Sequence, residues 1–163
     1  MLRASMAYRI LHQNQGLGLA MSGSVFINML YGPPTVALLE EIIRVQRKEM
    51  THARHAILTI IDPRVGKEMP AAARQRAREI SNEMEPHTMC NCFIVVGTGF
   101  FAAMVRSVVA GIQLFSKQKH PWKVTSGLDE AVPWLTELLA TEGKAIDTDD
   151  LRAAATAIMG GGR

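Results

Sequence analysis

Two short apolar runs, residues 56–61 (AILTII) and 90–96 (CNCFIVV), constrain the fold of this chain more than any other feature. Both are rich in β-branched residues, and neither shows the regular polar alternation of a half-exposed strand. This composition is typical of strands that are buried on both faces of a sheet. We therefore expect residues 57–61 and 93–96 to form adjacent central strands, because consecutive strands in such folds usually neighbour each other.

An opening hairpin and alternating helices and strands complete the predicted order. Residues 8–13 and 17–22 are predicted to pair as two strands joined by a turn at Asn14-Gln15-Gly16. Apolar residues at helical spacing, together with a last short apolar run, predict the other elements. They are helices at residues 36–52, 70–85, 100–115 and 128–140, and a strand at residues 122–125. The order ββαβαβαβα indicates an α/β fold with a mixed sheet and helices packed on it.

The chain length predicts one domain with short extensions. Its 163 residues, of which 48% are apolar, are enough for a single core. We expect an N-terminal extension at residues 1–7, the α/β domain at residues 8–140, and an acidic linker with a short Ala-rich helix at residues 141–163. The segment 126–129 is typical of a capping box, and Thr148 is the expected cap of the last helix. That helix is too short to be stable unless it docks on the domain or on a partner.

The net charge and the cysteine content indicate the cellular compartment and the classes of partner to expect. The formal net charge of +3 is too small to indicate a nucleic-acid partner. The first residues contain no apolar run of signal-peptide length, and no segment approaches ~18 uninterrupted apolar residues. Cys90 and Cys92 are one residue apart, and a disulfide between such near neighbours is strained. These features predict a soluble cytoplasmic protein without a membrane span.

The C-terminal part of the predicted domain resembles a known family. The strand at Trp122-Lys123-Val124 and the helix that begins Leu128-Asp129-Glu130-Ala131, with Trp134-Leu135 further along, resemble the SpoIIAA-like branch of the STAS superfamily, whose members end in a short strand and a "DEA…WL" helix. The resemblance covers roughly residues 8–140. It implies a mixed sheet of four to five strands flanked by helices, in a regulatory module that binds partner proteins and does not usually catalyse. Some members bind small apolar or nucleotide ligands.

One departure from that family concerns its regulation. Anti-sigma-factor antagonists carry a phosphorylatable serine after the central strand, at the start of the following helix. Residues 62–70 of this chain, which correspond to that region, contain neither serine nor threonine. The phosphorylation switch of the family is therefore not expected here.

Two segments are candidate partner-binding surfaces. Residues 24–31, between Gly23 and Gly32, are predicted to form a loop that is too apolar for an ordinary surface loop. This loop either covers the sheet edge, closes a pocket, or contacts another protein. The second predicted helix carries basic residues one turn apart, which form either a solvated face or a docking face for an acidic partner. The residues expected to bind a partner, or a second copy in a homodimer, are Phe26, Ile27, Leu30, Tyr31, Arg74 and Arg78.

A glycine-rich turn supports an alternative function. Gly97-Thr98-Gly99 follows an apolar strand and opens a helix, an arrangement in which backbone N–H groups can approach an anion. The acidic residue that a dinucleotide site needs about twenty residues later is absent, and Lys117 to Lys119 lie there instead. A structural turn is the simpler interpretation. The alternative is a small-molecule or nucleotide-binding domain, possibly an enzyme, that uses this turn.

No residue pattern indicates a metal, a cofactor or a catalytic centre. His87, Cys90 and Cys92 have ligand-like spacing, but a structural zinc site needs four ligands and no second cysteine pair occurs. His52 and His55 lack the HExxH context. We therefore expect a non-catalytic regulatory or scaffolding module that acts through protein–protein contact.

Overall fold

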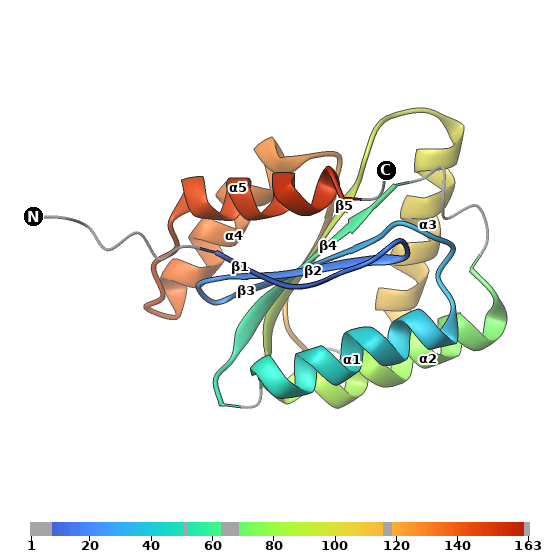
Figure 1. Ribbon diagram of the computed structural model, residues 1–163, viewed down its shortest axis with the longest axis horizontal. Coiled ribbons are helices and arrows are strands. Elements are labelled where there is room, and N and C mark those ends of the chain that lie inside the picture. The colour runs from blue at the N-terminus through green and yellow to red at the C-terminus, as the bar shows by residue number, and fades with distance from the viewer. Residues whose placement is uncertain (1–7, 51, 63–68, 116–118, 162–163) are drawn as a thin grey trace, which may run out of the picture.

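A six-stranded mixed sheet forms the centre of the computed structural model, with five α-helices distributed over its two faces (Figure 1). The structure describes residues 8–50, 52–62, 69–115 and 119–161, and the predicted extension at residues 1–7 lies outside them. The strands are β1 (Arg9–Gln13), β2 (Leu17–Ser22), β3 (Val25–Leu30), β4 (His55–Ile61), β5 (Thr88–Val95) and β6 (Trp122–Thr125). The helices are α1 (Val36–Met50), α2 (Ala71–Met84), α3 (Phe100–Phe115), α4 (Leu128–Thr141) and α5 (Thr148–Met159), and a 3-10 turn, η1 (Glu85–His87), follows α2.

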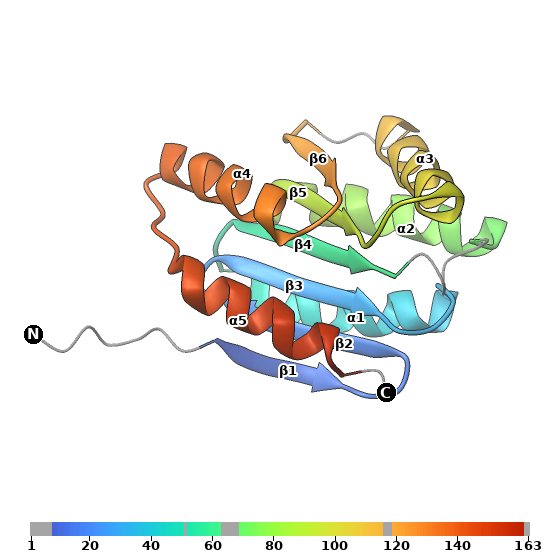
Figure 2. The ribbon, with the colours of Figure 1, turned by 90° about the horizontal axis from the view of Figure 1, so that it is seen from above.

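The strands lie in chain order from β1 at one edge to β6 at the other, as Figure 2 shows. The pairs β1–β2 and β2–β3 are antiparallel, whereas β3 to β6 run parallel. The prediction that β4 and β5 are adjacent central strands is confirmed, with Leu58 paired to Cys92 and Ile60 to Ile94. The general α/β class is confirmed as well.

The two faces of the sheet carry different helices. Ile27, Leu58 and Cys92 belong to one buried cluster with α4 and α5. Phe26 and Ile57 belong to a second cluster with α1 and α2, and α3 packs on the β5 and β6 end of that face. Because successive side chains of a strand point to opposite faces, a strand covered on both sides needs apolar residues at nearly every position. This explains the apolar runs in β4 and β5.

The segment predicted as an apolar loop is strand β3, so that prediction is wrong. Ser22 pairs with Val25 across a two-residue turn, in which Gly23 adopts a φ of +54°. Glycine allows this left-handed conformation without steric cost, so the chain reverses tightly and Val25–Leu30 enters the sheet between β2 and β4. The predicted order and the count of four to five strands are therefore also wrong, since the sheet has six.

The C-terminal helices begin differently from the expectation. Helix α4 starts after Gly127 without a side-chain cap, so the predicted capping box is not formed. Helix α5 is capped by Asp147, not Thr148, because an Asp147 carboxylate oxygen accepts hydrogen bonds from the backbone N–H groups of Asp149 (3.0 Å) and Asp150 (3.1 Å).

Helix α5 docks on the sheet. Its buried side chains pack over β1, β2 and β3, next to α4. The Tyr31 hydroxyl, just after β3, donates a hydrogen bond to the Ile158 carbonyl near the end of this helix. A helix that is marginal alone is thus held by its apolar face. The residues it buries are Leu151, Ala154, Ala155 and Ile158.

Candidate ligand-binding cavity

A cavity of about 170 Å³ lies between the sheet and the three helices α1, α2 and α3. Its floor is formed by residues of β3, β4 and β5, and its walls by the inward faces of the helices. Most of the lining is aliphatic, from residues such as Leu30, Ile57 and Val109. A concave, mostly apolar site with a few polar groups is the usual form of a small-molecule site.

Helix α2 contributes four side chains to the cavity lining, and it leaves room there because two of them are small and stand beside the larger Ile80 and Met84. Only Ala73, Ile80 and Met84 of this helix are buried, and the helix packs against α1 and α3. Ala77 and Ser81 face the cavity. Larger side chains at these two positions would fill the space between α2 and the sheet.

Polar side chains occur on the floor at positions where the strand pattern calls for apolar ones. Asn28 in β3 and Thr59 in β4 are direct neighbours in register, and Asn28 Nδ2 donates a hydrogen bond of 3.1 Å to Thr59 Oγ1. Asn91 in β5 lies beside Ile57, and its Nδ2 is 2.9 Å from His120 Nε2. The floor therefore carries the polar side chains of Asn28, Thr59 and Asn91, together with Thr88 of β5, within a largely apolar sheet face.

Two glutamines extend from the walls. Gln46 lies one turn after Ile42 on the buried face of α1, and Gln113 lies one turn after Val109 on the buried face of α3. Both line the cavity and are almost fully buried, with 3% and 4% of their surfaces exposed. The Oε1 atom of each has no hydrogen-bond partner within the described part of the chain. A buried carbonyl oxygen without a hydrogen-bond partner lowers the stability of the fold, so a hydrogen-bond donor placed in the cavity would stabilise both atoms.

His120 stands behind the floor of the cavity, through its contact with Asn91. Its side chain is buried, and burial lowers the pKa of its imidazole below the ordinary value. The charge of Arg54 acts in the same direction, and that of Glu85 opposes it. The protein therefore favours neutral His120 at this position.

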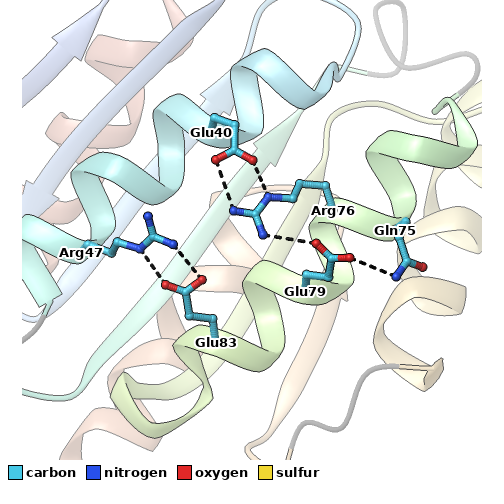
Figure 3. A network of polar contacts seen from close by, with 6 residues as sticks. All are labelled: Glu40, Arg47, Gln75, Arg76, Glu79 and Glu83. Carbon is cyan, nitrogen blue, oxygen red and sulfur yellow. Dashed lines mark hydrogen bonds and ion pairs between the residues drawn. The ribbon is translucent and has the colours of Figure 1, made fainter.

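Ion pairs join α1 to α2, as Figure 3 shows, and their residues are not among those that line the cavity. Arg76 of α2 binds Glu40 of α1 and also Glu79 of its own helix, at 3.3 Å. Arg47 of α1 binds both carboxylate oxygens of Glu83 in α2, at 2.6 and 2.9 Å. The hydrogen bonds from these arginines lower the pKa of the Glu40 and Glu83 carboxyls. These ion pairs link α2, which forms one wall of the cavity, to α1.

The residues predicted to bind a partner do not form one surface. Phe26 and Ile27 are fully buried in β3, and Leu30 lines the cavity. Tyr31 is half-buried, and burial raises the pKa of its hydroxyl. This hydroxyl donates a hydrogen bond to the Ile158 carbonyl and accepts one from Gln13 Nε2 at 3.3 Å. The predicted apolar contact surface is therefore wrong for Phe26 and Ile27, because an extra strand uses these side chains in the core.

The basic pair of the second helix lies apart from those residues. Arg74 is exposed on α2, and Arg78 is partly exposed, with its Nη2 donating a hydrogen bond of 3.0 Å to Gln75 Oε1. Contact of these arginines with an acidic partner stays a prediction.

The glycine-rich turn is a connection between β5 and α3 and does not line the cavity. Gly97 and Gly99 have φ values of +88° and +101°, which explains why both positions are glycine. Arg106 in α3 reaches back to this turn and donates a hydrogen bond of 2.7 Å to the Gly97 carbonyl. Residues 97–99, including Thr98, are exposed. Anion binding at this turn stays a prediction.

The two cysteines lie on the opposite face of the sheet from the cavity. Cys90 and Cys92 are buried among the residues that pack on α4 and α5. Burial raises the pKa of each thiol to about 12. Across the described ranges, no group of three or more His, Cys, Asp or Glu side chains is placed to hold a metal ion. Within the same ranges, no helix is long and apolar enough to cross a membrane.

The sequence prediction missed the residues that distinguish this cavity. Asn28 and Asn91 are single polar residues within apolar strands, and Gln46 and Gln113 occupy apolar positions of helical patterns. Each of these four polar residues can be recognised in the sequence as an exception to an apolar pattern. The sequence does not show that the four residues meet in one cavity, because they come from four separate elements.

Comparison of the chain with protein-family models, with curated proteins and with solved structures finds no match in any of the three.

Proposed function

We propose that this protein is a small-molecule-binding module whose site is the cavity beneath α1, α2 and α3. The observation that carries the proposal is the pair of buried glutamines, Gln46 and Gln113, which line a mostly apolar cavity and whose carbonyl oxygens have no hydrogen-bond partner among the residues that the structure describes. Buried polar groups are normally hydrogen-bonded, and exceptions often mark functional positions. An apolar ligand with a polar group would use both features of the site at once.

The polar groups of the site favour binding over catalysis. Asn28, Gln46, Asn91 and Gln113 are carboxamides, Thr59, Ser81 and Thr88 carry hydroxyls, and Asp62 supplies the one carboxyl among the described lining residues. Carboxamides and hydroxyls orient a ligand by hydrogen bonds, whereas acid–base chemistry needs a group whose pKa lies near the working pH. We therefore propose a non-catalytic, ligand-dependent regulatory role, which differs from the sequence-based expectation of a module that acts through protein–protein contact.

The resemblance to the SpoIIAA-like branch of the STAS superfamily is compatible with this function. That family includes binders of small apolar ligands, and a mixed sheet flanked by helices is its expected architecture. We propose membership of that superfamily on the C-terminal strand and helix, with the strand order of this chain as a difference.

Titration with toluene, followed by NMR of the labelled protein, tests whether the cavity accepts a small molecule. We expect saturable shifts of signals from residues that line the cavity. Ala77→Leu adds bulk from α2 into the cavity and should weaken toluene binding by about tenfold or more. Ala72→Leu is the matched control, because Ala72 is exposed on the same helix. Absence of saturable shifts, or equal binding by Ala77→Leu, would contradict the proposal.

Self-association through α3 is a second candidate function, favoured by exposed apolar side chains on that helix. Phe100 and Leu114 are 77% and 72% exposed, and Phe101 packs edge-on against Phe100. Small domains usually keep such side chains covered, so a second copy of the chain is the proposed partner. Light scattering over a concentration series should show a dimer that the double substitution Phe100→Ser, Leu114→Ser weakens. A monomer at all concentrations would exclude it.

A further inference from the structure

We infer that the ligand of the cavity is an uncharged molecule about the size of a substituted benzene ring, carrying a hydroxyl or carboxamide group. This inference rests on the proposed function, because it names the class of ligand for the same cavity. It follows from the size of the cavity, from the two glutamine oxygens that have no partner among the described residues, and from the carboxamides and hydroxyls that supply most of the polar lining.

The size of the ligand follows from the volume. An engineered cavity of about 150 Å³ lined by aliphatic and aromatic side chains binds benzene. The cavity here, at about 170 Å³, is slightly larger, and its lining is also mostly apolar but includes polar side chains. A single ring with one small substituent therefore fits it. A whole nucleotide is far larger than this volume.

The donor group follows from Gln46 and Gln113. Each Oε1 is a buried acceptor without a partner in the described part of the chain, so a ligand that donates a hydrogen bond removes a cost already present in the free protein. A carboxamide can also rotate by half a turn and offer its N–H groups instead. A hydroxyl or carboxamide on the ligand complements either orientation, because both groups donate and accept. A purely apolar ring leaves both glutamines as they were.

The absence of charge on the ligand follows from the nature of these partners. Asn28, Gln46 and Gln113 present dipoles, and an ion that leaves water for such a site loses more hydration than neutral dipoles return. Asp62, at the end of β4, is the ionisable residue among the described lining, so a cationic probe must be part of the test. Binding of the cationic probe tests whether the Asp62 carboxyl attracts a positively charged ligand instead.

Phenol and toluene form the matched pair of probes, because they differ by one hydroxyl in place of a methyl group. Each is titrated into the wild-type protein and into the variants Gln46→Leu and Gln113→Leu, with binding followed by NMR. Leucine keeps the approximate volume of glutamine without its amide. We expect each substitution to weaken phenol binding by about five- to tenfold, while toluene binding stays equal or tightens. Toluene binding also reports that each variant retains a folded cavity.

Benzamide, benzoate and benzylammonium then test the charge. We expect benzamide to bind at least about tenfold more tightly than either ion at neutral pH.

The outcomes separate this inference from the proposed function. If toluene binds and phenol responds no differently to the two glutamine substitutions, the cavity is a site but the inferred ligand class is wrong. Tighter binding of benzoate or benzylammonium than of benzamide would also overturn the class. If none of the probes binds the wild-type protein, the proposed function itself fails.

Discussion

Replacing Gln46 with leucine should stabilise the protein when no ligand is bound. In the wild-type protein the Gln46 side chain is 3% exposed and its Oε1 lacks a partner among the described residues. An unsatisfied buried acceptor costs about 1–3 kcal/mol. Leucine has nearly the same volume, so it removes this cost without overpacking the space between α1 and the sheet. We expect the free energy of unfolding to rise by about 1–3 kcal/mol.

The expected rise is large enough to measure in a thermal melt. For a chain of 163 residues, each kcal/mol changes the melting temperature by about 2–4 °C. A gain of about 2 kcal/mol therefore raises it by about 4–8 °C. Urea unfolding gives the same free energy independently, provided that the slope with denaturant is unchanged. Gln15→Leu is the control, because Gln15 is exposed in the first hairpin and its substitution should change stability little.

A fall in the unfolding free energy of Gln46→Leu would refute this reasoning. It would mean that the Gln46 amide makes a net stabilising hydrogen bond and that its oxygen is not an unmet acceptor. The same variant should bind phenol less tightly, so a gain in stability should accompany a loss of ligand affinity. Such a trade-off is expected where a site holds polar groups at the expense of the fold.

Three further predictions concern the rest of the structure. The pKa of His120 is lowered in the folded protein, so the neutral imidazole is favoured there. The contribution of His120 to the free energy of unfolding is therefore present above about pH 6.5 and is lost as the pH falls below that value. In urea titrations between pH 5 and 7, His120→Gln should reduce this loss. Part of the loss should remain, because burial also lowers the pKa of His55. Ile158→Ala should lower the unfolding free energy by about 2–5 kcal/mol, because Ile158 is fully buried where α5 docks; a change under about 1 kcal/mol would show that the helix is peripheral. Arg47→Gln should lower the melting temperature at low salt, and the difference should vanish in 1 M NaCl (roughly a 3 Å screening length).

The helices and the central strands could be predicted because each carries its own periodicity. Val36–Met50 and Phe100–Phe115 have an apolar face at helical spacing, and His55–Ile61 is a β-branched run closed by Asp62-Pro63. These signals lie within single windows of the chain. The sequence therefore predicted their pairing order correctly for β4 and β5.

Strand β3 could not be predicted in the same way. It is buried on both faces, so it shows no alternation, and glycines at positions 23 and 32 mark both of its ends as turns. An apolar run between two turn signals is typical of a loop covering a core as well as of a short buried strand. Only its pairing partners, β2 and β4, decide between the two.

The cavity depends on the tertiary structure even more strongly. Its four carboxamides, Asn28, Gln46, Asn91 and Gln113, come from β3, α1, β5 and α3, and no single element contains two of them. A polar residue in an apolar pattern indicates a position of interest but does not indicate which other positions meet it. The useful rule for similar chains is to note each such residue and to ask whether the expected topology brings them to one face of the sheet.

The two faces of the sheet divide stability and binding between them. On the α4 and α5 face the side chains of β3, β4 and β5 are aliphatic or cysteine, and α5 adds fully buried residues such as Leu151 and Ile158. On the other face the same strands place Asn28, Thr59 and Asn91 beneath helices that leave a cavity. Because successive residues of a strand alternate between faces, polar positions on one side do not interrupt the apolar packing on the other. The tightly packed face can therefore offset the cost of the cavity, so the chain can hold unmet hydrogen-bond acceptors ready for a ligand and still remain folded.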